Sequence, residues 1–219
     1  MRTVAILPIK SFDKAKQRLR FDLPEHDRRA LAESMFSDTL VALGRVPALE
    51  SIVVVSSDRV AQRIAGGYGA RVIEEEERGH NAAAARGVEA LVEEGIERAL
   101  LVPGDCPLLS PADIQALLAH EVPERSALIV PDRHGTGTNA LLLTPPDVLA
   151  PSFGPDSCRR HLADAQQSDV PAQVVEIDSL ALDIDTPDDL EALQRKLAAT
   201  HGGAAHTRGM LNQLMRARA

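Results

Sequence analysis

Short apolar runs alternate with longer stretches of helical periodicity along most of this chain. The runs are rich in Val, Ile and Leu and predict strands at residues 3–9, 51–57, 98–102 and 127–130. A segment long enough for a helix follows each of the first three runs. Strands that alternate with helices are typical of crossover units in a parallel sheet. The pattern therefore predicts an α/β fold, with a mostly parallel central sheet and helices on both of its faces.

The segments between the strands carry helix signals of their own. Residues 26–46 place mainly apolar side chains three and four positions apart, which predicts one helix with a buried stripe. The members of this stripe are Leu31, Met35, Thr39, Leu40 and Leu43. Further helices are expected from Asp58, over residues 81–94, and from Pro111, which follows the N-cap residue Ser110.

The pattern changes from residue 127 onward. A polar, glycine-containing loop joins the apolar runs 127–130 and 140–143, which favours a small antiparallel excursion. A helix over 155–165, a strand over 173–177 and a last helix from Thr186 are expected to complete a single domain over residues 1–199. Residues 200–219 are expected to form a basic tail that is flexible or packs on a partner subunit. Its basic residues include Arg208, Arg216 and Arg218.

The composition excludes several classes of protein. A chain of 219 residues that is 44% hydrophobic can bury one sizeable core. The net charge of −8 and an aromatic content of 2% argue against a nucleic-acid-binding protein. No apolar stretch reaches the roughly 20 residues of a membrane span. The amino-terminal apolar run stops at Pro8, too early for a signal peptide, and two cysteines outside any CxxC pair indicate a reducing compartment, so we expect a cytoplasmic protein.

Acidic residues stand where two predicted elements meet the ligand-binding edge of the sheet. Asp105 directly follows the strand 98–102 and Pro103-Gly104. Asp183 and Asp185 precede the last helix, and residues two apart in an extended segment point to the same side. Mg²⁺ typically binds one or two carboxylates together with substrate phosphates, so Asp105 with Asp183 or Asp185 is a candidate magnesium site. Capping of the following helix or turn is the alternative role for Asp105 and Asp185.

A basic loop follows the first predicted strand, with four cationic side chains within nine residues. They are Lys10, Lys14, Lys16 and Arg18. In an acidic protein, such a loop is expected to bind phosphates, and a solvated basic turn is the alternative. The chain has neither a GxxxxGK phosphate loop nor a dinucleotide GxGxxG motif after this strand.

A candidate anion site lies at the start of the predicted helix 155–165. Gly154 and Ser157 flank this start, and backbone N–H groups with a hydroxyl at a helix N-terminus bind anions. Helix capping by Asp156 or Ser157 is the alternative. His161, in the same helix, is a candidate ligand or base, although an isolated histidine is more often structural.

Six short motifs follow one another along the chain: PIK (8–10), AKQRL (15–19), GHNAA (79–83), GDCPLL (104–109), GTNAL (137–141) and DIDTPDDL (183–190). In this order, they resemble the 2-phospho-L-lactate guanylyltransferase family, whose bacterial members include the phosphoenolpyruvate guanylyltransferases of coenzyme F-420 biosynthesis. The resemblance covers about residues 3–198. It implies a single-domain, GT-A-like nucleotidyltransferase that transfers GMP from GTP to the phosphate of a three-carbon phosphoacid.

The resemblance also implies roles for individual residues. Lys10, Lys16 and Arg18 would act on the triphosphate and the pyrophosphate leaving group, and Asp105, Asp183 and Asp185 would hold Mg²⁺. The nucleotide is expected at Lys10, Ser57, Asn81 and Gly104, and the phosphoacid at Thr138, Gly154 and Ser157. The expected partners are these two substrates, a downstream transferase that consumes a labile product and, in a homodimer, a second copy of the chain.

Two alternatives remain open at this point. A related nucleotidyltransferase would share the nucleotide-binding motifs but act on 3-phosphoglycerate, a sugar phosphate or molybdopterin. A nucleotide-binding regulatory protein would keep the fold without the chemistry. The presence of Lys10, Arg18, Asp105 and Asp185 argues against the second alternative.

Overall fold

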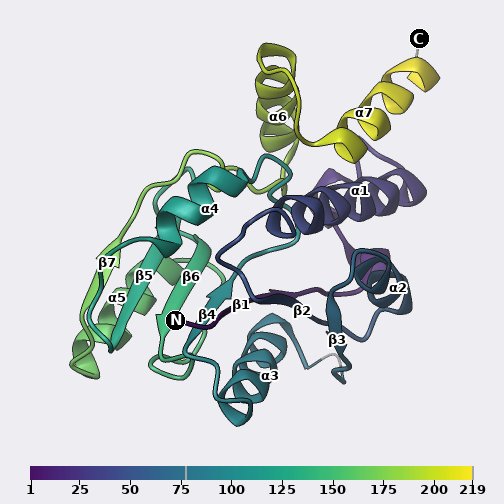
Figure 1. Cartoon of the computed structure of the whole chain (residues 1–219). Coiled ribbons are helices and arrows are strands. Elements are labelled where there is room, and N and C mark those ends of the chain that lie inside the picture. The colour runs from purple at the N-terminus through teal and green to yellow at the C-terminus, as the bar shows by residue number, and fades with distance from the viewer. Residues whose placement is uncertain (77, 219) are drawn as a thin grey trace.

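The computed structural model describes residues 1–76 and 78–218 and contains one seven-stranded sheet (Figure 1). The strands are β1 Thr3–Pro8, β2 Ser51–Val55, β3 Arg71–Ile73, β4 Arg98–Leu101, β5 Ser126–Pro131, β6 Thr138–Thr144 and β7 Ala172–Val174. They lie in the order β3-β2-β1-β4-β6-β5-β7. β6 runs antiparallel to both β4 and β5, whereas all other neighbouring strands are parallel. Two of the cations named above, Lys14 and Arg218, have side chains outside the described part.

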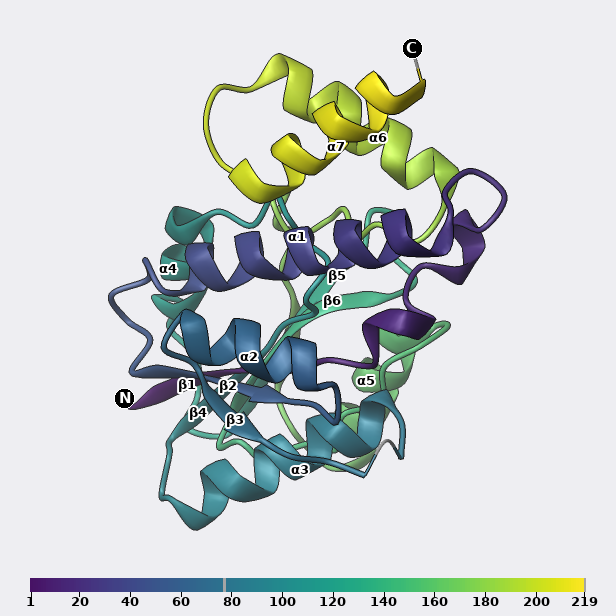
Figure 2. The same cartoon turned by 90° about the vertical axis from the view of Figure 1, so that its right-hand side faces the viewer.

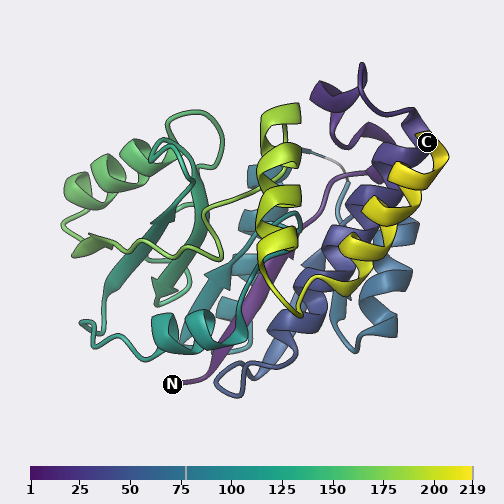
Figure 3. The ribbon, with the colours of Figure 1, turned by 90° about the horizontal axis from the view of Figure 1, so that it is seen from above.

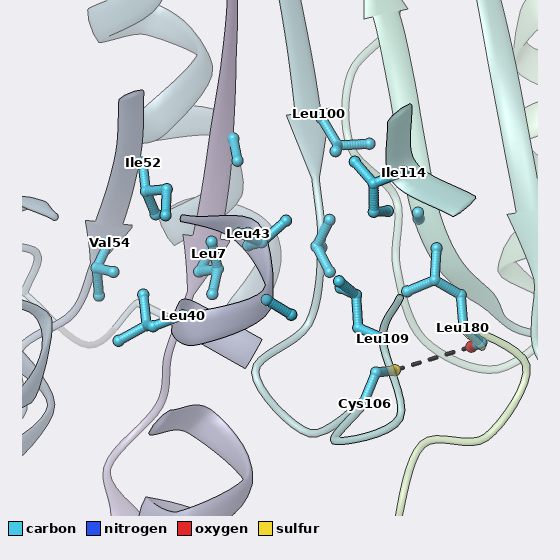
Figure 4. Close-up of a cluster of buried hydrophobic side chains, with 14 of the residues drawn as sticks. Leu7, Leu40, Leu43, Ile52, Val54, Leu100, Cys106, Leu109, Ile114 and Leu180 are labelled. Atoms are coloured by element: carbon cyan, nitrogen blue, oxygen red, sulfur yellow. Dashed lines mark hydrogen bonds between the residues drawn. The ribbon is translucent and has the colours of Figure 1, made fainter. Parts of the chain in front are cut away.

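Helices cover both faces of the sheet. They are α1 Glu25–Leu43, α2 Arg59–Gly67, α3 His80–Glu93, α4 Pro111–Leu118, α5 Ser157–Gln167, α6 Pro187–Ala199 and α7 Ala205–Arg218, with the short 3-10 helices η1 Phe12–Lys14 and η2 Gln17–Leu19. Side chains alternate across each strand, so β1 places Leu7 in a core shared with α1, α2 and α4 (Figure 4) and Ile6 in a core shared with α3 and α5. The sheet is thereby buried on both faces, as its continuous apolar strands require.

A third helical layer, formed by α6 and α7, lies outside α1 (Figure 2). α1 is therefore buried on two sides: Phe36 and Leu40 belong to the core on the sheet, and Leu31 and Met35 to a cluster shared with α6 and α7. This cluster also includes Leu19, from the loop after β1. The outer layer thus helps to hold a loop that the sequence assigns to the candidate site.

The segment 200–219, for which a flexible or partner-packed tail is predicted, contains α7 in the structure, and α7 lies along α1 (Figure 3). Asp38 of α1 accepts hydrogen bonds from the backbone N–H groups of His206, at 3.0 Å, and Thr207, at 2.8 Å. Arg208 donates to the carbonyl of Leu197 at 2.6 Å and to other carbonyls after α6. These contacts lie within the chain, and packing on a partner subunit stays a prediction.

The α/β class, the mostly parallel sheet and the antiparallel excursion are confirmed. The expected strand 173–177 is shorter and begins one residue earlier, as β7. Strand β3 and helix α7 were not predicted, because a three-residue strand has too few positions to show a periodic pattern and α7 is a largely polar helix. Within the described residues, no helix has both the length and the apolar character that crossing a membrane requires.

Candidate active site

A cleft of about 360 Å³ opens at the carboxyl ends of β1 and β4, beside the first residues of β6. Parallel strands end at this edge, and antiparallel β6 begins there, so loops from distant parts of the sequence converge. The predicted site residues that line the cleft are Lys10, Lys16, Gly104, Asp105, Thr138, Gly154, Asp183 and Asp185. The structure thus brings together residues from all four predicted groups: triphosphate, nucleotide, phosphoacid and metal.

The two acids of the last motif reach the cleft because the chain before α6 alternates. Leu182 and Ile184 are buried in the cluster under α6 and α7, whereas Asp183 and Asp185 line the cleft. Thr186 then caps α6 in a capping box with Asp189. Thr186, and not Asp185, therefore caps this helix, and the Asp185 carboxylate faces the cleft.

Lys16 joins two of the acids. Its ammonium donates hydrogen bonds to Asp105 and, at 3.1 Å, to Asp185. The backbone of Lys16 has φ 53°, in the left-handed region that non-glycine residues rarely adopt. Burial lowers the pKa of Lys16, but the charges of Asp105 and Asp185 outweigh this effect and raise the pKa above its ordinary value. Lys16 therefore remains a cation, paired with both Asp105 and Asp185.

Asp183 is the carboxylate of the three that Asn139 holds. Asn139 donates to its Oδ1 at 3.2 Å and to the carbonyl of Leu180 at 2.7 Å. Burial, followed by the charge of Asp105, raises the pKa of Asp183 to about 6, and the hydrogen bond from Asn139 opposes this rise. A positive charge near Asp183 would stabilise its ionised form.

The acids fit a hard cation in part. Asp105 Oδ1 is buried and accepts no hydrogen bond from the described residues, so this atom can take a further positive partner. Among the described residues, no three His, Cys, Asp or Glu side chains converge closely enough to hold an ion by themselves. This donor set suits Mg²⁺, which commonly takes one or two carboxylates and completes its shell with phosphates and waters.

The basic loop is held in place from three directions. Phe12 is buried against Phe36, Leu19 enters the cluster under α7, and the N–H of Phe12 donates to Asp58 at 2.8 Å. Lys10 is exposed and lines the cleft, whereas Arg18 is exposed and does not line it. The loop thus presents Lys10 and Lys16 to the cleft, and Arg18 stands outside its wall.

Two residues of the candidate anion site line the same cleft as the basic loop. Thr138 is buried at the start of β6 and lines the cleft together with Gly154, whose φ of 118° favours glycine. Ser157 begins α5, is 1% exposed, and its Oγ has no hydrogen-bond partner among the described residues. Its N–H donates to the carbonyl of Gly154 at 3.1 Å. Ser157 does not itself line the cleft, although its unpartnered hydroxyl stands one turn behind Gly154.

Two of the predicted nucleotide residues lie outside the cleft wall. Ser57 follows β2 and does not line the cleft. Asn81 instead brackets Phe153: its Nδ2 donates to the Phe153 carbonyl at 3.1 Å, and its Oδ1 accepts from the Phe153 N–H at 2.8 Å. Asn81 therefore ties the start of α3 to the loop that contains Gly154.

His80 lines the cleft and was not among the predicted site residues. Its ring packs edge-on against Phe153, with centroids 5.3 Å apart. Burial and the charge of Lys10 lower the pKa of His80 to about 4, against the opposing charge of Asp105. In neutral His80, one ring nitrogen can donate a hydrogen bond and the other can accept one. The signal that could have identified it is its place in the GHNAA motif, at the first position of a helix.

Comparison with known proteins agrees with this geometry. Residues 3–217 match the family described as CofC-like guanylyl transferases. The chain belongs to this family. A phosphoenolpyruvate guanylyltransferase from Conexibacter woesei is 51% identical over 99% of this chain and 98% of its own length. A 3-phospho-D-glycerate guanylyltransferase from Colwellia psychrerythraea is 37% identical over 88% and 91% of the two chains.

A third relative is the 2-phospho-L-lactate guanylyltransferase of Methanothermobacter thermautotrophicus. It is 31% identical over 98% of this chain and 92% of its own length. Among solved structures, a nucleotidyl transferase from the same genus superposes with a TM-score of 0.66 at 16% identity, over 91% of this chain and 99% of that chain. The expected nucleotidyltransferase fold is therefore confirmed, and the three relatives differ in the acceptor that their names state.

Proposed function

We propose that this protein transfers GMP from GTP to phosphoenolpyruvate and releases pyrophosphate, forming an enolpyruvoyl-diphospho-guanosine for coenzyme F-420 biosynthesis. The observation that carries the proposal is the 51% identity, over nearly the whole of both chains, to a phosphoenolpyruvate guanylyltransferase. The cleft supports it, because cationic, acidic and anion-binding groups line one cavity at the edge of the sheet.

The reaction needs no general base from the protein. A phosphate oxygen of the acceptor is already an anion at neutral pH and attacks the α-phosphorus of GTP. A new oxygen–phosphorus bond forms, the bond to the bridging oxygen of the β-phosphate breaks, and pyrophosphate leaves with that electron pair. The protein accelerates such a step by holding the two substrates in line and by balancing negative charge.

Lys10 and Lys16 are the cations that the structure presents to this reaction. Lys10 is free to contact the triphosphate, and Lys16 reaches the cleft from its position between Asp105 and Asp185. Bound Mg²⁺, held by Asp105 with Asp183 or Asp185, would supply charge neutralisation for the phosphates. Arg18 stands outside the cleft wall, and we assign it to the pyrophosphate leaving group, as the family resemblance implies.

The acceptor is assigned to the part of the cleft lined by Thr138 and Gly154. The Thr138 hydroxyl and the backbone at Gly154 suit a carboxylate, which accepts several hydrogen bonds, and the buried, unpartnered hydroxyl of Ser157 lies close behind them. The Colwellia relative favours 3-phosphoglycerate as a second candidate acceptor, since it also carries a carboxylate and a phosphate. We further propose a cytoplasmic location. We also propose a downstream transferase that consumes the product, because an enol ester of a diphosphate hydrolyses readily.

The test is pyrophosphate release from GTP and Mg²⁺ with phosphoenolpyruvate, 2-phospholactate or 3-phosphoglycerate, with the downstream transferase present to trap an unstable product. Turnover that is greatest with phosphoenolpyruvate supports the proposal. Turnover with 3-phosphoglycerate alone moves the assignment to the second candidate, and tight GTP binding without turnover on any acceptor contradicts both. Parallel reactions with ATP and CTP test the choice of guanine.

A further inference from the structure

His161 of α5 is a buried histidine whose two ring nitrogens are both hydrogen-bonded. It is 0% exposed. Its Nε2 lies 3.0 Å from the backbone N of Ser152, and its Nδ1 lies 3.1 Å from the hydroxyl of Thr138. The ring therefore links the start of β6 to the loop that precedes α5.

These two contacts determine the tautomer. A backbone N–H can only donate, so Nε2 of His161 must accept and carries no proton. The single proton of the neutral ring then resides on Nδ1 and is donated to the oxygen of Thr138. Burial lowers the pKa of His161 to about 4, the charge of Asp164 opposes this effect and the charge of Arg160 adds to it, so the ring stays neutral at physiological pH.

The tautomer in turn determines what Thr138 can offer. Its oxygen accepts from Nδ1 of His161, which leaves the hydroxyl proton for a different acceptor. Thr138 lines the cleft on the side assigned to the phosphoacid, and its hydroxyl contacts no other polar group within the described residues. The Thr138 hydroxyl is therefore available as a hydrogen-bond donor, which an oxygen of a carboxylate or phosphate requires.

The other bond of His161 acts on the loop 152–155. Arg160 donates to the carbonyls of Ser152, at 2.7 Å, and Pro155, while Asn81 holds Phe153 by two hydrogen bonds. Gly154 stands in the middle of this loop. Each of its neighbours is thereby fixed to α5 or α3, and the bond from Ser152 to His161 is the one that connects the loop to Thr138.

We propose that His161 is a positioning residue for the phosphoacid, which orients the Thr138 hydroxyl as a donor and sets the distance between Thr138 and Gly154. This inference rests on the proposed function, because it takes the Thr138 side of the cleft as the acceptor side. It predicts an effect that is confined to one substrate. Among the described residues, no hydrogen bond or ion pair joins His161 to the basic loop or to the three acids of the cleft, so GTP binding should be unaffected by its replacement.

The test compares three substitutions in the full chain. His161→Phe keeps the ring volume and removes both bonds, His161→Asn retains a donor near the Nδ1 position, and His161→Gln retains an acceptor near the Nε2 position. We expect His161→Phe to raise KM for the phosphoacid about 10- to 100-fold, as the loss of two hydrogen bonds implies, while KM for GTP changes less than about 3-fold. His161→Asn should restore part of the phosphoacid KM, and the control is His120→Gln, at an exposed histidine that follows α4.

A second measurement does not depend on turnover. In wild-type protein with ¹⁵N-labelled histidine, long-range NMR correlations should show the Nδ1–H tautomer for His161. The Nε2–H tautomer would overturn the inference, as would equal increases of KM for both substrates or unchanged phosphoacid KM in His161→Phe. If wild-type protein turns over none of the three phosphoacids, the proposed function fails, and the tautomer then decides whether His161 orients Thr138 in the manner described.

Discussion

Asp189 accepts a hydrogen bond at 3.1 Å from the backbone N–H of Asp185, one of the acids that line the cleft. The same carboxylate oxygen accepts from the N–H and the hydroxyl of Thr186, each at 2.7 Å. Its other oxygen forms an ion pair at 2.6 Å with Arg133, from the loop between β5 and β6. Burial raises the pKa of Asp189, but the hydrogen bonds from Thr186 outweigh burial and bring it below the ordinary value. Asp189 thus holds the backbone at Asp185 in place.

Asp189→Asn should lower both stability and turnover. In either orientation of the amide, an NH2 group that cannot accept faces Arg133 or the three donors around Asp185 and Thr186. We expect a loss of about 1–3 kcal/mol of unfolding free energy, typical for a lost cap and an unsatisfied buried partner. Urea unfolding and pyrophosphate release measure the two effects.

Asp188→Asn is the matched control, because Asp188 lies in the same first turn of α6 but is exposed. It changes the net charge by the same amount and should cost less than about 1 kcal/mol. Equal effects of the two substitutions would show that charge at the helix N-terminus, rather than the bonds to Asp185, explains the result.

Asp105→Asn tests the assignment of the metal ligand. The amide has the size of the carboxylate but removes one negative charge beside Lys16, whose remaining partner is Asp185. We expect turnover to fall at least about 100-fold, the cost typical of losing one preorganised electrostatic group. Binding of Mn²⁺ alone, measured by electron paramagnetic resonance, should weaken in parallel. A folded Asp105→Asn protein with near-normal turnover would contradict the assignment.

The strands and the acids were predictable because their signals are local. Leu182 and Ile184 alternate with Asp183 and Asp185 over four residues, and that alternation alone indicates which side chains face the core. The GHNAA motif marks the position of His80 but not its lowered pKa, since two of the groups that shift this pKa, Lys10 and Asp105, come from other loops. Its environment exists only after the sheet has formed.

Helix α7 escaped prediction for a related reason. The carboxylate of Asp38 accepts a hydrogen bond from the backbone N–H of His206, which lies 168 residues later in the chain. A sequence pattern that ends in Arg216 and Arg218 resembles a mobile tail as long as this distant cap is unknown. Likewise, the sequence could not show that the Asn81 amide forms two hydrogen bonds with Phe153, and the expected contact of Asn81 with the nucleotide stays a prediction.

Gly104 is required by close packing rather than by backbone conformation. A Cβ atom at this position would lie 2.5 Å from Ile9 Cδ1 and 3.1 Å from Phe36 Cδ2. Gly104→Ala should therefore displace the Ile9 side chain against its neighbours and cost about 1 kcal/mol or more. Gly66→Ala, in α2 with open space around the new methyl group, should instead be neutral or stabilise by about 0.5–1 kcal/mol. Calorimetric melting of both variants distinguishes the two cases, and similar melting temperatures would contradict the close contact.

Asp38 should control whether α7 stays on α1. Asp38→Ala removes both acceptors for the N-terminal N–H groups of α7, and we expect a loss of about 1–2 kcal/mol, as for other N-caps. Asp38→Asn keeps one acceptor and should lose less. Amide hydrogen exchange of residues 205–216 should accelerate in Asp38→Ala more than exchange of β1. Uniform acceleration across the chain would mean that α7 does not open separately.

Stability should rise with pH between pH 4 and 6.5, because two buried histidines resist protonation in the folded state. The folded pKa of His80 and of His161 is lowered to about 4 from 6.5. As the pH falls through 6.5, the unfolded chain takes up protons at both residues and the folded chain does not, so the folded state loses stability until about pH 4. Asp183 acts in the opposite direction, because its pKa in the folded state is raised from 3.8 to about 6. Between these pH values the folded chain keeps a proton on Asp183 that the unfolded chain has lost, so this residue makes the folded state less stable as the pH rises.

The two histidines raise the free energy of unfolding as the pH rises, and the one carboxyl lowers it. The net slope is therefore positive and at most about 1.4 kcal/mol per pH unit. Urea unfolding at the two ends of the window measures it. His161→Phe removes one of the two histidine contributions and should flatten the slope, whereas Asp183→Asn removes the opposing carboxyl and should make it steeper. His120→Gln, an exposed histidine substitution, should leave the slope unchanged. Stability that falls with rising pH in the wild-type protein would show that the carboxyl dominates and that the histidines titrate near their ordinary pKa.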